Sequence, residues 1–420
     1  MEAIIIEGGR PLRGEVEVGG AKNAVLPMMA ASLLVPGPVE IHNVPRLRDV
    51  TTFLDLLREM GATGGYTNHS LHLDASRVTS HEAPYDHVKK MRASIYVLGP
   101  LLARFGEARV SLPGGCAWGP RPVNLHQDAM EGLGAKLTLE HGYIVGRAKH
   151  LKGNRIVFDV SSVGATGNAM MAAVLAEGTT ALENAAAEPE IEALADFLNR
   201  LGARVKGGGT KTITIEGVAE LQPGVTYENI PDRIEAGTLL VAGAITGGEV
   251  LVRRVRPDHM TMVLSRLEKM GCELEVAEDT IRIRVGAGGL KGVDIVTEPY
   301  PGFPTDMQAQ FMVLLCMAEG VGVITETIYP DRFTHVPELR RLGAQITLSG
   351  NAATVTGTGA LQGADVMSTD IRASSALILG GLAAHGKTHV SRIYHIDRGY
   401  ERIEEKLRQL GARIRRVAED

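Results

Sequence analysis

Six amphipathic helices recur along the chain, and each ends at a glycine in a Leu-Gly-Ala motif or a close variant of it. In the last of these segments, Tyr400, Ile403, Leu407 and Leu410 form one apolar stripe on a surface helix. The following glycine supplies the left-handed conformation that ends a helix. The six glycines, separated by 68 to 73 residues, are Gly61, Gly134, Gly202, Gly271, Gly343 and Gly411. This regular spacing predicts an internal repeat of about 70 residues.

A second helix in each repeat is apolar almost all round, so it belongs in the interior. These six segments span residues 24–35, 94–103, 167–176, 236–245, 310–318 and 374–384. Alternating apolar and polar residues, as in 212–215 and 281–285, predict half-buried strands joined by turns. Each repeat is expected to run strand, buried helix, strand, surface helix, strand, strand, which gives an α/β fold.

The last repeat has one strand fewer than the others, because only residues 413–417 follow Gly411. The N-terminal segment 3–6 is apolar and could supply the missing hairpin partner. We therefore expect two domains of three repeats each, joined by two crossings of the chain that suit a hinge. The expected domains are residues 21–230, which carry a cysteine loop, and residues 1–20 plus 231–420.

Composition excludes several classes of function. The 420 residues include 44 Lys and Arg against 49 Asp and Glu, a net charge of −5, and 4% are aromatic. Such a chain is a poor binder of nucleic acid or of a membrane surface. Its three cysteines cannot form a disulfide framework, and its longest uncharged apolar segment, near 236–248, is too short to span a bilayer. Since no basic and apolar leader is present, we expect a cytoplasmic protein.

Charged and polar residues gather where the apolar helices begin. Lys22, Arg92, Arg233 and Arg372 lie at four of these starts. A helix N-terminus has free N–H groups and about half a positive charge. At any one position, ordinary capping and solvated arginines explain the pattern equally well. Because polar residues, several of them Lys or Arg, stand at this same position in all six repeats, the pattern favours a site for a polyanion.

The glycine- and proline-rich segment 112–122 is predicted to be an exposed turn. It contains Cys116 and, five residues later, Arg121. A nearby arginine lowers the pKa of a thiol and makes it reactive, whereas the plainer interpretation is a small apolar residue in a loop. Cys272 and Cys316 are expected in the core. Histidines are scattered without metal-ligand spacing, and no phosphate-binding glycine loop occurs.

Nine stretches along nearly the whole chain resemble the UDP-N-acetylglucosamine enolpyruvyl transferase family. They are residues 19–23, 91–94, 113–116, 121–123, 162–166, 231–235, 303–310, 370–374 and 394–402. These stretches coincide with the helix starts and with the cysteine loop. The fold that the resemblance implies consists of two inside-out α/β-barrel domains, each of three repeats with buried helices, in agreement with the repeat count.

The resemblance implies a reaction. The family transfers the enolpyruvyl group of phosphoenolpyruvate to the 3-hydroxyl of UDP-N-acetylglucosamine and releases phosphate, by addition and then elimination. This is the first committed step of peptidoglycan synthesis, and no metal or organic cofactor is implied. The expected partners are these two small molecules, and the oligomeric state is left open.

The resemblance also assigns roles around phosphoenolpyruvate, which carries a phosphate and a carboxylate and needs several cations. Its implied binding residues are Lys22, Asn23, Arg121, Arg332, Arg372 and Arg398. Cys116 is the expected proton donor to the enol carbon, and fosfomycin-type epoxides alkylate this cysteine in the family. Asp306 is expected to accept the proton of the sugar hydroxyl. The implied catalytic residues are Cys116, Asp306, Lys22 and Arg398.

A longer set of residues is implied for the nucleotide sugar. It comprises Asn23, Arg92, Arg121, Pro122, Val123, Asn124, Leu125, Ser162, Val163, Gly164, Asp306 and Ile328. The chain departs from the family pattern at two positions on this side of the site. Val160 stands where many members have lysine, and Asn124 stands where many have aspartate.

Two alternatives remain open from the sequence. A shikimate-pathway enolpyruvyl transferase has the same fold and donor but lacks the cysteine loop. A catalytically silent paralogue would bind the nucleotide sugar without turnover, although this chain retains Lys22, Cys116, Asp306, Arg372 and Arg398.

Overall fold

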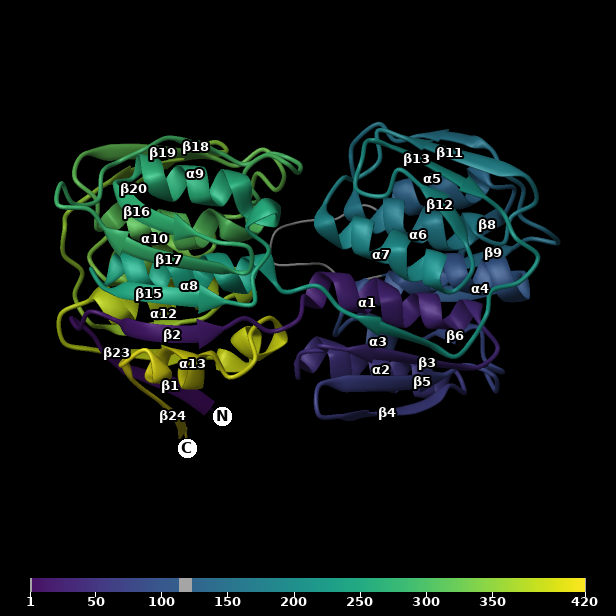
Figure 1. The fold of residues 1–420 in the computed structure, drawn as a ribbon, viewed down its shortest axis with the longest axis horizontal. Coiled ribbons are helices and arrows are strands. Elements are labelled where there is room, and N and C mark those ends of the chain that lie inside the picture. Colours follow the sequence, from purple (N-terminus) through teal and green to yellow (C-terminus); the bar gives the residue numbers. More distant parts are fainter. Residues whose placement is uncertain (1, 113–122, 420) are drawn as a thin grey trace. The chain divides into compact units, whose positions relative to one another are not determined.

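The computed structural model describes residues 2–112 and 123–419, which form two compact units. The central unit consists of the described residues from Gly20 to Ile230 (Figure 1). The terminal unit combines the N-terminal residues up to Gly19 with the chain from Pro231 onward. Each unit has its own cluster of buried apolar side chains, drawn from that unit alone. Each unit therefore has a separate hydrophobic core.

Three helices in each unit are buried along most of their length, because apolar side chains surround them and leave no face for water. In the central unit these inner helices are α1 (Lys22–Ala31), α4 (Leu98–Phe105) and α6 (Val163–Ala173). In the terminal unit they are α8 (Arg233–Ile245), α10 (Gln308–Cys316) and α12 (Ile371–Ala383). Three short 3-10 segments adjoin them: η1 (Ser32–Leu34), η2 (Arg92–Val97) and η4 (Thr305–Met307).

Five inner helices begin earlier than the apolar pattern indicated, whereas α4 begins at Leu98, four residues later than expected and directly after η2. Lys22, Arg233 and Arg372 lie within the first turns of α1, α8 and α12. A search for apolar residues misses these turns, since their side chains are charged. Some of the polar residues that were expected to precede the inner helices are therefore part of those helices.

Six further helices bury one face only, as their amphipathic pattern predicted. In the described chain they are α2 (Arg48–Glu59), α5 (Asn124–Gly132), α7 (Pro189–Arg200), α9 (Thr261–Lys269), α11 (Val336–Arg341) and α13 (Ile403–Gln409). The glycine after each has φ between 91° and 103°, which confirms the predicted left-handed stop. Three smaller helical segments are α3 (Tyr85–Val88), η3 (Pro257–Met260) and η5 (Ile393–Arg398).

The strands of the central unit form three four-stranded sheets within the described residues. Their orders are β14-β3-β5-β4, β6-β7-β9-β8 and β10-β11-β13-β12. The strands are β3 (Pro38–His42), β4 (Thr63–Thr67), β5 (Ser70–Asp74), β6 (Glu82–Ala83), β7 (Glu107–Ser111), β8 (Lys136–Glu140), β9 (Tyr143–Arg147), β10 (Arg155–Val157), β11 (Thr179–Glu183), β12 (Arg204–Lys206), β13 (Thr212–Glu216) and β14 (Val225–Glu228). In each sheet the first pair is parallel and the other two pairs are antiparallel.

The terminal unit repeats this arrangement in the described residues, with the orders β2-β15-β17-β16, β18-β19-β21-β20 and β22-β23-β1-β24, each with the parallel pair first. The strands are β1 (Glu2–Glu7), β2 (Arg13–Glu17), β15 (Glu249–Arg253), β16 (Cys272–Val276), β17 (Thr280–Val285), β18 (Ile295–Val296), β19 (Val321–Thr325), β20 (Gln345–Ser349), β21 (Ala352–Thr356), β22 (Asp365–Met367), β23 (Lys387–Ser391) and β24 (Arg413–Ala418). Strand β1 pairs antiparallel with both β23 and β24. The N-terminal segment therefore completes the last repeat, as predicted.

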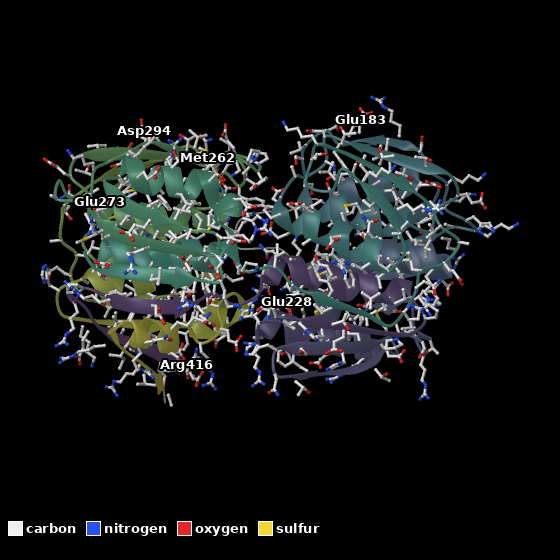
Figure 2. All side chains as sticks on the ribbon, viewed as in Figure 1. Glu183, Glu228, Met262, Glu273, Asp294 and Arg416 are labelled. Carbon is white, nitrogen blue, oxygen red and sulfur yellow. The ribbon has the colours of Figure 1, made fainter. Side chains whose placement is uncertain are left out.

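Charged side chains form pairs across neighbouring strands in both units, and Figure 2 labels two of the glutamates that take part, Glu183 and Glu273. Glu183 on β11 accepts two hydrogen bonds of 2.7 Å from Arg155 on the neighbouring strand. Glu273 on β16 likewise accepts a hydrogen bond of 2.7 Å from Arg284. Such exposed cross-strand pairs contribute little to stability, so the apolar interior carries most of it.

A close backbone approach recurs where a hairpin strand meets the end of an inner helix. A Cβ atom on Gly217, just after β13, would lie 1.6 Å from the carbonyl oxygen of Ala176, just after α6. The corresponding atom on Gly357 would lie 1.7 Å from the carbonyl oxygen of Ala318. Only glycine fits there, because backbone atoms cannot move aside as a side chain can.

We expect Gly217→Ala to lower the free energy of unfolding by about 3 kcal/mol or more, since the added methyl group must push β13 away from the end of α6. Gly65→Ala is the matched control in the same unit, because no atom lies within 4 Å of its Cβ position. Urea unfolding followed by circular dichroism measures both variants. Equal midpoints for the two would contradict this packing constraint.

Candidate functional site

Lys22 begins the first inner helix of the central unit and is itself buried, with 8% of its surface exposed. Its Nζ atom lies 3.5 Å from Oδ2 of Asp49, a buried residue near the start of α2. A buried ammonium group is costly unless an opposite charge accompanies it. The N-cap residue is Ala21, whose methyl group cannot cap the first N–H groups of α1. This helix start thus places a buried cation and Asn23 beside the first backbone N–H groups of α1.

The starts of α5 and α6 lie together in the same unit through a buried histidine, His126. Its Nδ1 atom lies 3.0 Å from the amide nitrogen of Asn168 on α6. A Cβ atom on Gly164 would lie 3.0 Å from Nε2 of His126, so glycine permits the close approach. Burial and, secondarily, the charge of Arg92 lower the pKa of His126 to about 4, which keeps its ring neutral at pH 7.

These contacts bring several expected nucleotide-sugar residues into one region of the central unit. Val123 and Asn124 begin α5, with Leu125 next. Ser162 caps α6 by accepting a hydrogen bond of 3.3 Å from the backbone N–H of Ala165, and Val163 and Gly164 form the first turn. Arg92 begins η2 and lies close enough to His126 to affect its pKa.

Asp306 is the centre of the second group of expected site residues, which belongs to the terminal unit. Its Oδ1 atom accepts a hydrogen bond of 2.8 Å from Nη2 of Arg332. Its Oδ2 atom accepts one of 2.6 Å from Nη2 of Arg372. Both arginines are 5% exposed, whereas a quarter of the Asp306 side chain remains accessible. One carboxylate is therefore held between two buried guanidinium groups and keeps an open side.

The two arginines control the protonation of Asp306. Burial by itself would raise the pKa of this carboxyl group. The charges and hydrogen bonds of Arg372 and Arg332 outweigh burial and hold the pKa of Asp306 well below its usual range. In return, the pKa of Arg372 is raised, because the charge of Asp306 overcomes its desolvation. Asp306 and Arg372 are therefore both charged at neutral pH.

The hydroxyl group of Tyr400 joins the starts of all three inner helices of the terminal unit. It lies 2.9 Å from Oγ1 of Thr238 on α8. It also accepts hydrogen bonds of 3.2 Å from Gln310 on α10 and from Arg372 on α12. This shared contact fixes the first turns of α8, α10 and α12 at one place, so Arg372 has a defined orientation toward Asp306.

Arg398 and Ile328 lie on segments that adjoin this group. Arg398 ends η5, which packs against α12, and the next residue, Gly399, would carry a Cβ atom 3.8 Å from Nη1 of Arg372. The backbone N–H of Ile328 donates to Oε1 of Glu326 at 2.9 Å. Asp306, Arg332, Arg372, Arg398 and Ile328 are thus all on segments around the starts of α10 and α12.

Three of the expected residues, Cys116, Arg121 and Pro122, lie outside the described residues. Val160, the first departure from the family pattern, is 63% exposed, and Asn124 is also exposed. The sequence interpretation missed Asp49, His126 and Tyr400. Tyr400 lies within the quoted stretch 394–402 and His126 follows Leu125 directly, whereas no pattern singled out Asp49.

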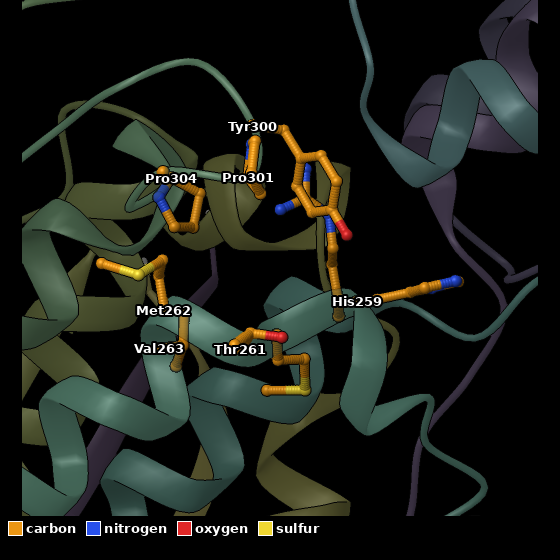
Figure 3. Close-up of a pocket in the computed structure, with 10 residues that line it drawn as sticks. His259, Thr261, Met262, Val263, Tyr300, Pro301 and Pro304 are labelled. Carbon is orange, nitrogen blue, oxygen red and sulfur yellow. The ribbon is translucent and has the colours of Figure 1, made fainter. Parts of the chain in front are cut away.

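Arg233 has a different environment from the other expected cations. Its guanidinium carbon lies 5.6 Å from the centre of the Tyr300 ring. Together with His259 and Thr261, these residues line a small pocket beside α9 (Figure 3). At this distance the negative face of the ring attracts the guanidinium charge, a cation–π interaction.

A search for other types of site among the described residues gave two negative results. No group of three or more histidine, cysteine, aspartate or glutamate side chains is arranged to hold a metal ion within residues 2–112 and 123–419. Over the same part of the chain, no helix combines the length and apolar character needed to cross a membrane.

Comparison with known proteins agrees with this geometry. The family model for EPSP synthase (3-phosphoshikimate 1-carboxyvinyltransferase) matches residues 6–407. Relatives named UDP-N-acetylglucosamine 1-carboxyvinyltransferase from Chlorobium luteolum and Trichlorobacter lovleyi are each 55% identical. The first alignment covers 99% of this chain and 98% of the relative, and the second covers 100% of both.

Solved structures agree as well. The enolpyruvyl transferase NikO from Streptomyces tendae superposes with a TM-score of 0.91 at 27% identity, over 100% of this chain and 99% of that one. EPSP synthase from Acinetobacter baumannii shares the fold, with a TM-score of 0.76 at 19% identity and full coverage of both chains. The fold is therefore the mixed α/β fold of enolpyruvyl transferases, and the protein is a transferase of that class. Within it, the chain belongs to the family of the UDP-N-acetylglucosamine 1-carboxyvinyltransferases.

We expect Asp306→Asn to lower the free energy of unfolding by about 2 kcal/mol at neutral pH, because two charge-assisted hydrogen bonds lose their anionic acceptor. The folded-state pKa of Asp306 is depressed, so its contribution is present above the unfolded value of about 3.9 and is lost as the pH falls through the folded value. The difference between wild type and variant should therefore shrink in acid.

Urea unfolding at a series of pH values from 7 downward measures this difference. Asp279→Asn, in an exposed turn of the same unit, is the control and should leave stability unchanged at every pH. If the free energies of unfolding of wild type and Asp306→Asn differed by the same amount at neutral pH and in strong acid, the result would contradict the assigned ion pairs.

Proposed function

We propose that this chain transfers the enolpyruvyl group of phosphoenolpyruvate to the 3-hydroxyl of UDP-N-acetylglucosamine and releases phosphate, the first committed step of peptidoglycan synthesis. The observation that carries the proposal is the Asp306 carboxylate between Arg332 and Arg372. A partly open site with two buried cations and one carboxylate suits an anionic donor and an acceptor that must lose a proton. The names of the full-length relatives support the choice of both substrates.

The donor carries its negative charge at two ends, so it needs cations from several elements. We assign Lys22, Asn23, Arg121 and Arg398 to its phosphate. Arg332 and Arg372 take its carboxylate, for which a planar guanidinium fork is well suited. The buried positions of Lys22, Arg332 and Arg372 support this assignment, because desolvated cations bind anions more strongly than exposed ones do.

Asp306 acts as the base that accepts the proton of the sugar hydroxyl. In the free protein its two arginine partners make it a weak base, since they hold its pKa well below the usual range. A donor carboxylate would share the charge of Arg332 and Arg372 and so raise the proton affinity of Asp306. The base is thus activated once the donor is bound, and Cys116 acts as the acid that protonates the enol carbon.

The nucleotide sugar is assigned to the starts of α5 and α6 in the central unit and to Ile328 in the terminal unit. Its central-unit contacts are Asn23, Arg92, Arg121, Pro122, Val123, Asn124, Leu125, Ser162, Val163 and Gly164. The start of α1 and the starts of the other inner helices supply partial positive charge that favours a pyrophosphate. The ring of His126 is neutral at pH 7, so it adds no second positive charge beside Arg92.

We further propose that each unit is an inside-out α/β barrel and an enolpyruvyl transferase domain, bounded at residues 21–230 and at 1–20 plus 231–420. The three sheets and three buried helices in each unit support this architecture. We place the reaction in the cytoplasm, because both proposed substrates are charged and do not cross membranes unaided.

The decisive test is release of inorganic phosphate from phosphoenolpyruvate. We expect release with UDP-N-acetylglucosamine as acceptor and none with shikimate 3-phosphate, because the chain carries the Cys116 loop and groups with the nucleotide-sugar branch. Turnover with shikimate 3-phosphate alone would assign the chain to the other branch. Tight binding of the nucleotide sugar without phosphate release would indicate a silent paralogue.

Replacing Cys116 by serine should reduce turnover by about a hundredfold or more, the usual contribution of a positioned general acid. Cys316→Ser is the matched control. Cys316 is fully buried on α10, its thiol donates to the carbonyl oxygen of Met312 at 3.3 Å, and burial raises its pKa to about 12. A serine hydroxyl can keep that hydrogen bond, so turnover should persist. Similar losses in both variants would remove the special role of Cys116.

A further inference from the structure

Glu326 is a fully buried carboxylate that the proposed mechanism leaves without a role. It follows β19 directly and none of its surface is exposed. Within the described residues no lysine, arginine or histidine forms an ion pair with it. A buried carboxylate without a cation must be satisfied by hydrogen bonds, and each of its acceptor sites needs a donor.

Four donors surround the carboxylate. Oε1 accepts hydrogen bonds from Oγ1 of Thr297 at 2.8 Å and from the backbone N–H groups of Ile328 at 2.9 Å and Tyr329 at 3.0 Å. Oε2 accepts one from Oγ1 of Thr305 at 2.8 Å. The two oxygens therefore serve different neighbours: Oε1 holds the segment that contains Ile328, and Oε2 holds the residue before Asp306.

The backbone of Glu326 is fixed as firmly as its side chain. Its N–H donates to the carbonyl oxygen of Asn351 at 2.8 Å. Its carbonyl oxygen accepts a hydrogen bond of 3.0 Å from the side-chain amide of Asn351. Asn351 lies in the turn between β20 and β21, so the carboxylate is anchored to a sheet rather than to a mobile loop.

Chemistry fixes the direction of the hydrogen bonds that lead from Glu326 to Asp306. Nη1 of Arg332 donates to Oγ1 of Thr305 at 2.8 Å, and a guanidinium group cannot accept. The Thr305 hydroxyl must therefore use its own proton for Oε2 of Glu326. The other arm of Arg332 donates to Asp306. The Thr305 hydroxyl thus has one orientation, set by Glu326, and it presents a lone pair to Arg332.

We propose that Glu326 is a positioning residue that, through the Thr305 hydroxyl, orients Arg332 for the carboxylate of phosphoenolpyruvate. The inference rests on the proposed function, which gives Arg332 that ligand. Glu326 touches neither substrate in this scheme. Its carboxylate is required because all four neighbours are donors. An amide at this position would turn its NH₂ group toward the Thr305 hydroxyl, and the proton of that hydroxyl would lose its acceptor.

A plainer account makes Glu326 a structural clamp for residues 326–329 and nothing more. That account predicts that a change at Glu326 weakens binding of both substrates equally. The proposal predicts that only binding of phosphoenolpyruvate suffers, because Oε2 acts through Thr305 on Arg332. In Glu326→Gln the amide oxygen can remain at the Oε1 position, where three donors point. The NH₂ group then replaces Oε2 and reverses the hydrogen bond to Thr305.

Steady-state kinetics on the full chain test the proposal with Glu326→Gln, Thr305→Val and Thr305→Ser. We expect Glu326→Gln and Thr305→Val each to raise the KM for phosphoenolpyruvate about tenfold, the effect of one lost hydrogen bond to a charged group, with the KM for UDP-N-acetylglucosamine changed less than about twofold. Thr305→Ser keeps the hydroxyl and should retain wild-type values. The double variant should have the same KM for phosphoenolpyruvate as Thr305→Val, because both substitutions break the same hydrogen bond between Thr305 and Glu326.

Thr388→Val is the matched control for removal of a buried hydroxyl in the same unit. Thr388 is fully buried, and its hydroxyl has no hydrogen-bond partner among the described residues, so kinetics should stay at wild-type values. A wild-type KM for phosphoenolpyruvate in Thr305→Val would overturn the proposal. So would losses that multiply in the double variant, or equal increases in both KM values in Glu326→Gln.

Failure of the proposed function is distinguishable from failure of this inference. If the wild-type chain releases no phosphate from the two substrates, the proposed function falls whatever the variants do. A crystal structure of Glu326→Gln then decides the positioning role. Arg332 displaced from Thr305 would support it, and Arg332 unmoved between Thr305 and Asp306 would overturn it.

Discussion

A carboxylate held between two buried guanidinium groups is the interaction on which the site of the terminal unit depends. Arg332 and Arg372 are almost fully buried, and neither could stay charged there at low cost without Asp306. The three residues come from separate segments, since Arg332 follows Asp306 by 26 positions and Arg372 follows it by 66. Folding of the unit and assembly of this site are therefore the same event, since the charges are compensated only when the segments meet.

The inner helices explain why the charges lie where they do. A helix that is apolar almost all round can carry charged groups only at its ends, because its middle turns contact the core. In the terminal unit, Tyr400 ties the first turns of α8, α10 and α12 together, and Arg372 and Asp306 lie at two of those starts. The central unit follows the same rule with Lys22 on α1 and Ser162 before α6. In each unit, the repeat thus places polar residues at the starts of the inner helices. Which residues stand at those starts differs between the repeats, and this difference gives each helix start its own chemistry.

Local patterns predicted most of the fold. The glycines after the outer helices, the apolar inner helices and the pairing of β1 with β24 were all expected, because each depends on periodicity or on counting strands within a repeat. The first turns of α1, α8 and α12 were missed, since charged residues occupy them.

The pairings inside the site could not be predicted in the same way. Lys22 with Asp49, and Asp306 with two distant arginines, are contacts between segments that no periodicity relates. The resemblance to a family supplied the names of several of these residues, but not their partners. Glu326 illustrates the limit most clearly, because a lone acidic residue after a strand looks like surface until the surrounding donors are known.

The charge balance of the terminal-unit site also constrains how it can work. Asp306 satisfies its arginines when no substrate is present, which stabilises the fold but occupies the groups proposed to bind the donor. Binding must therefore be an exchange, in which a substrate carboxylate takes over part of the interaction that Asp306 provides. Such an exchange leaves the total charge on the arginines compensated throughout, so the cost of desolvation is not incurred a second time. Under the proposed function, this exchange would release the carboxylate of Asp306 for proton transfer only when a donor is bound, which would couple the chemistry of the base to occupancy of the site.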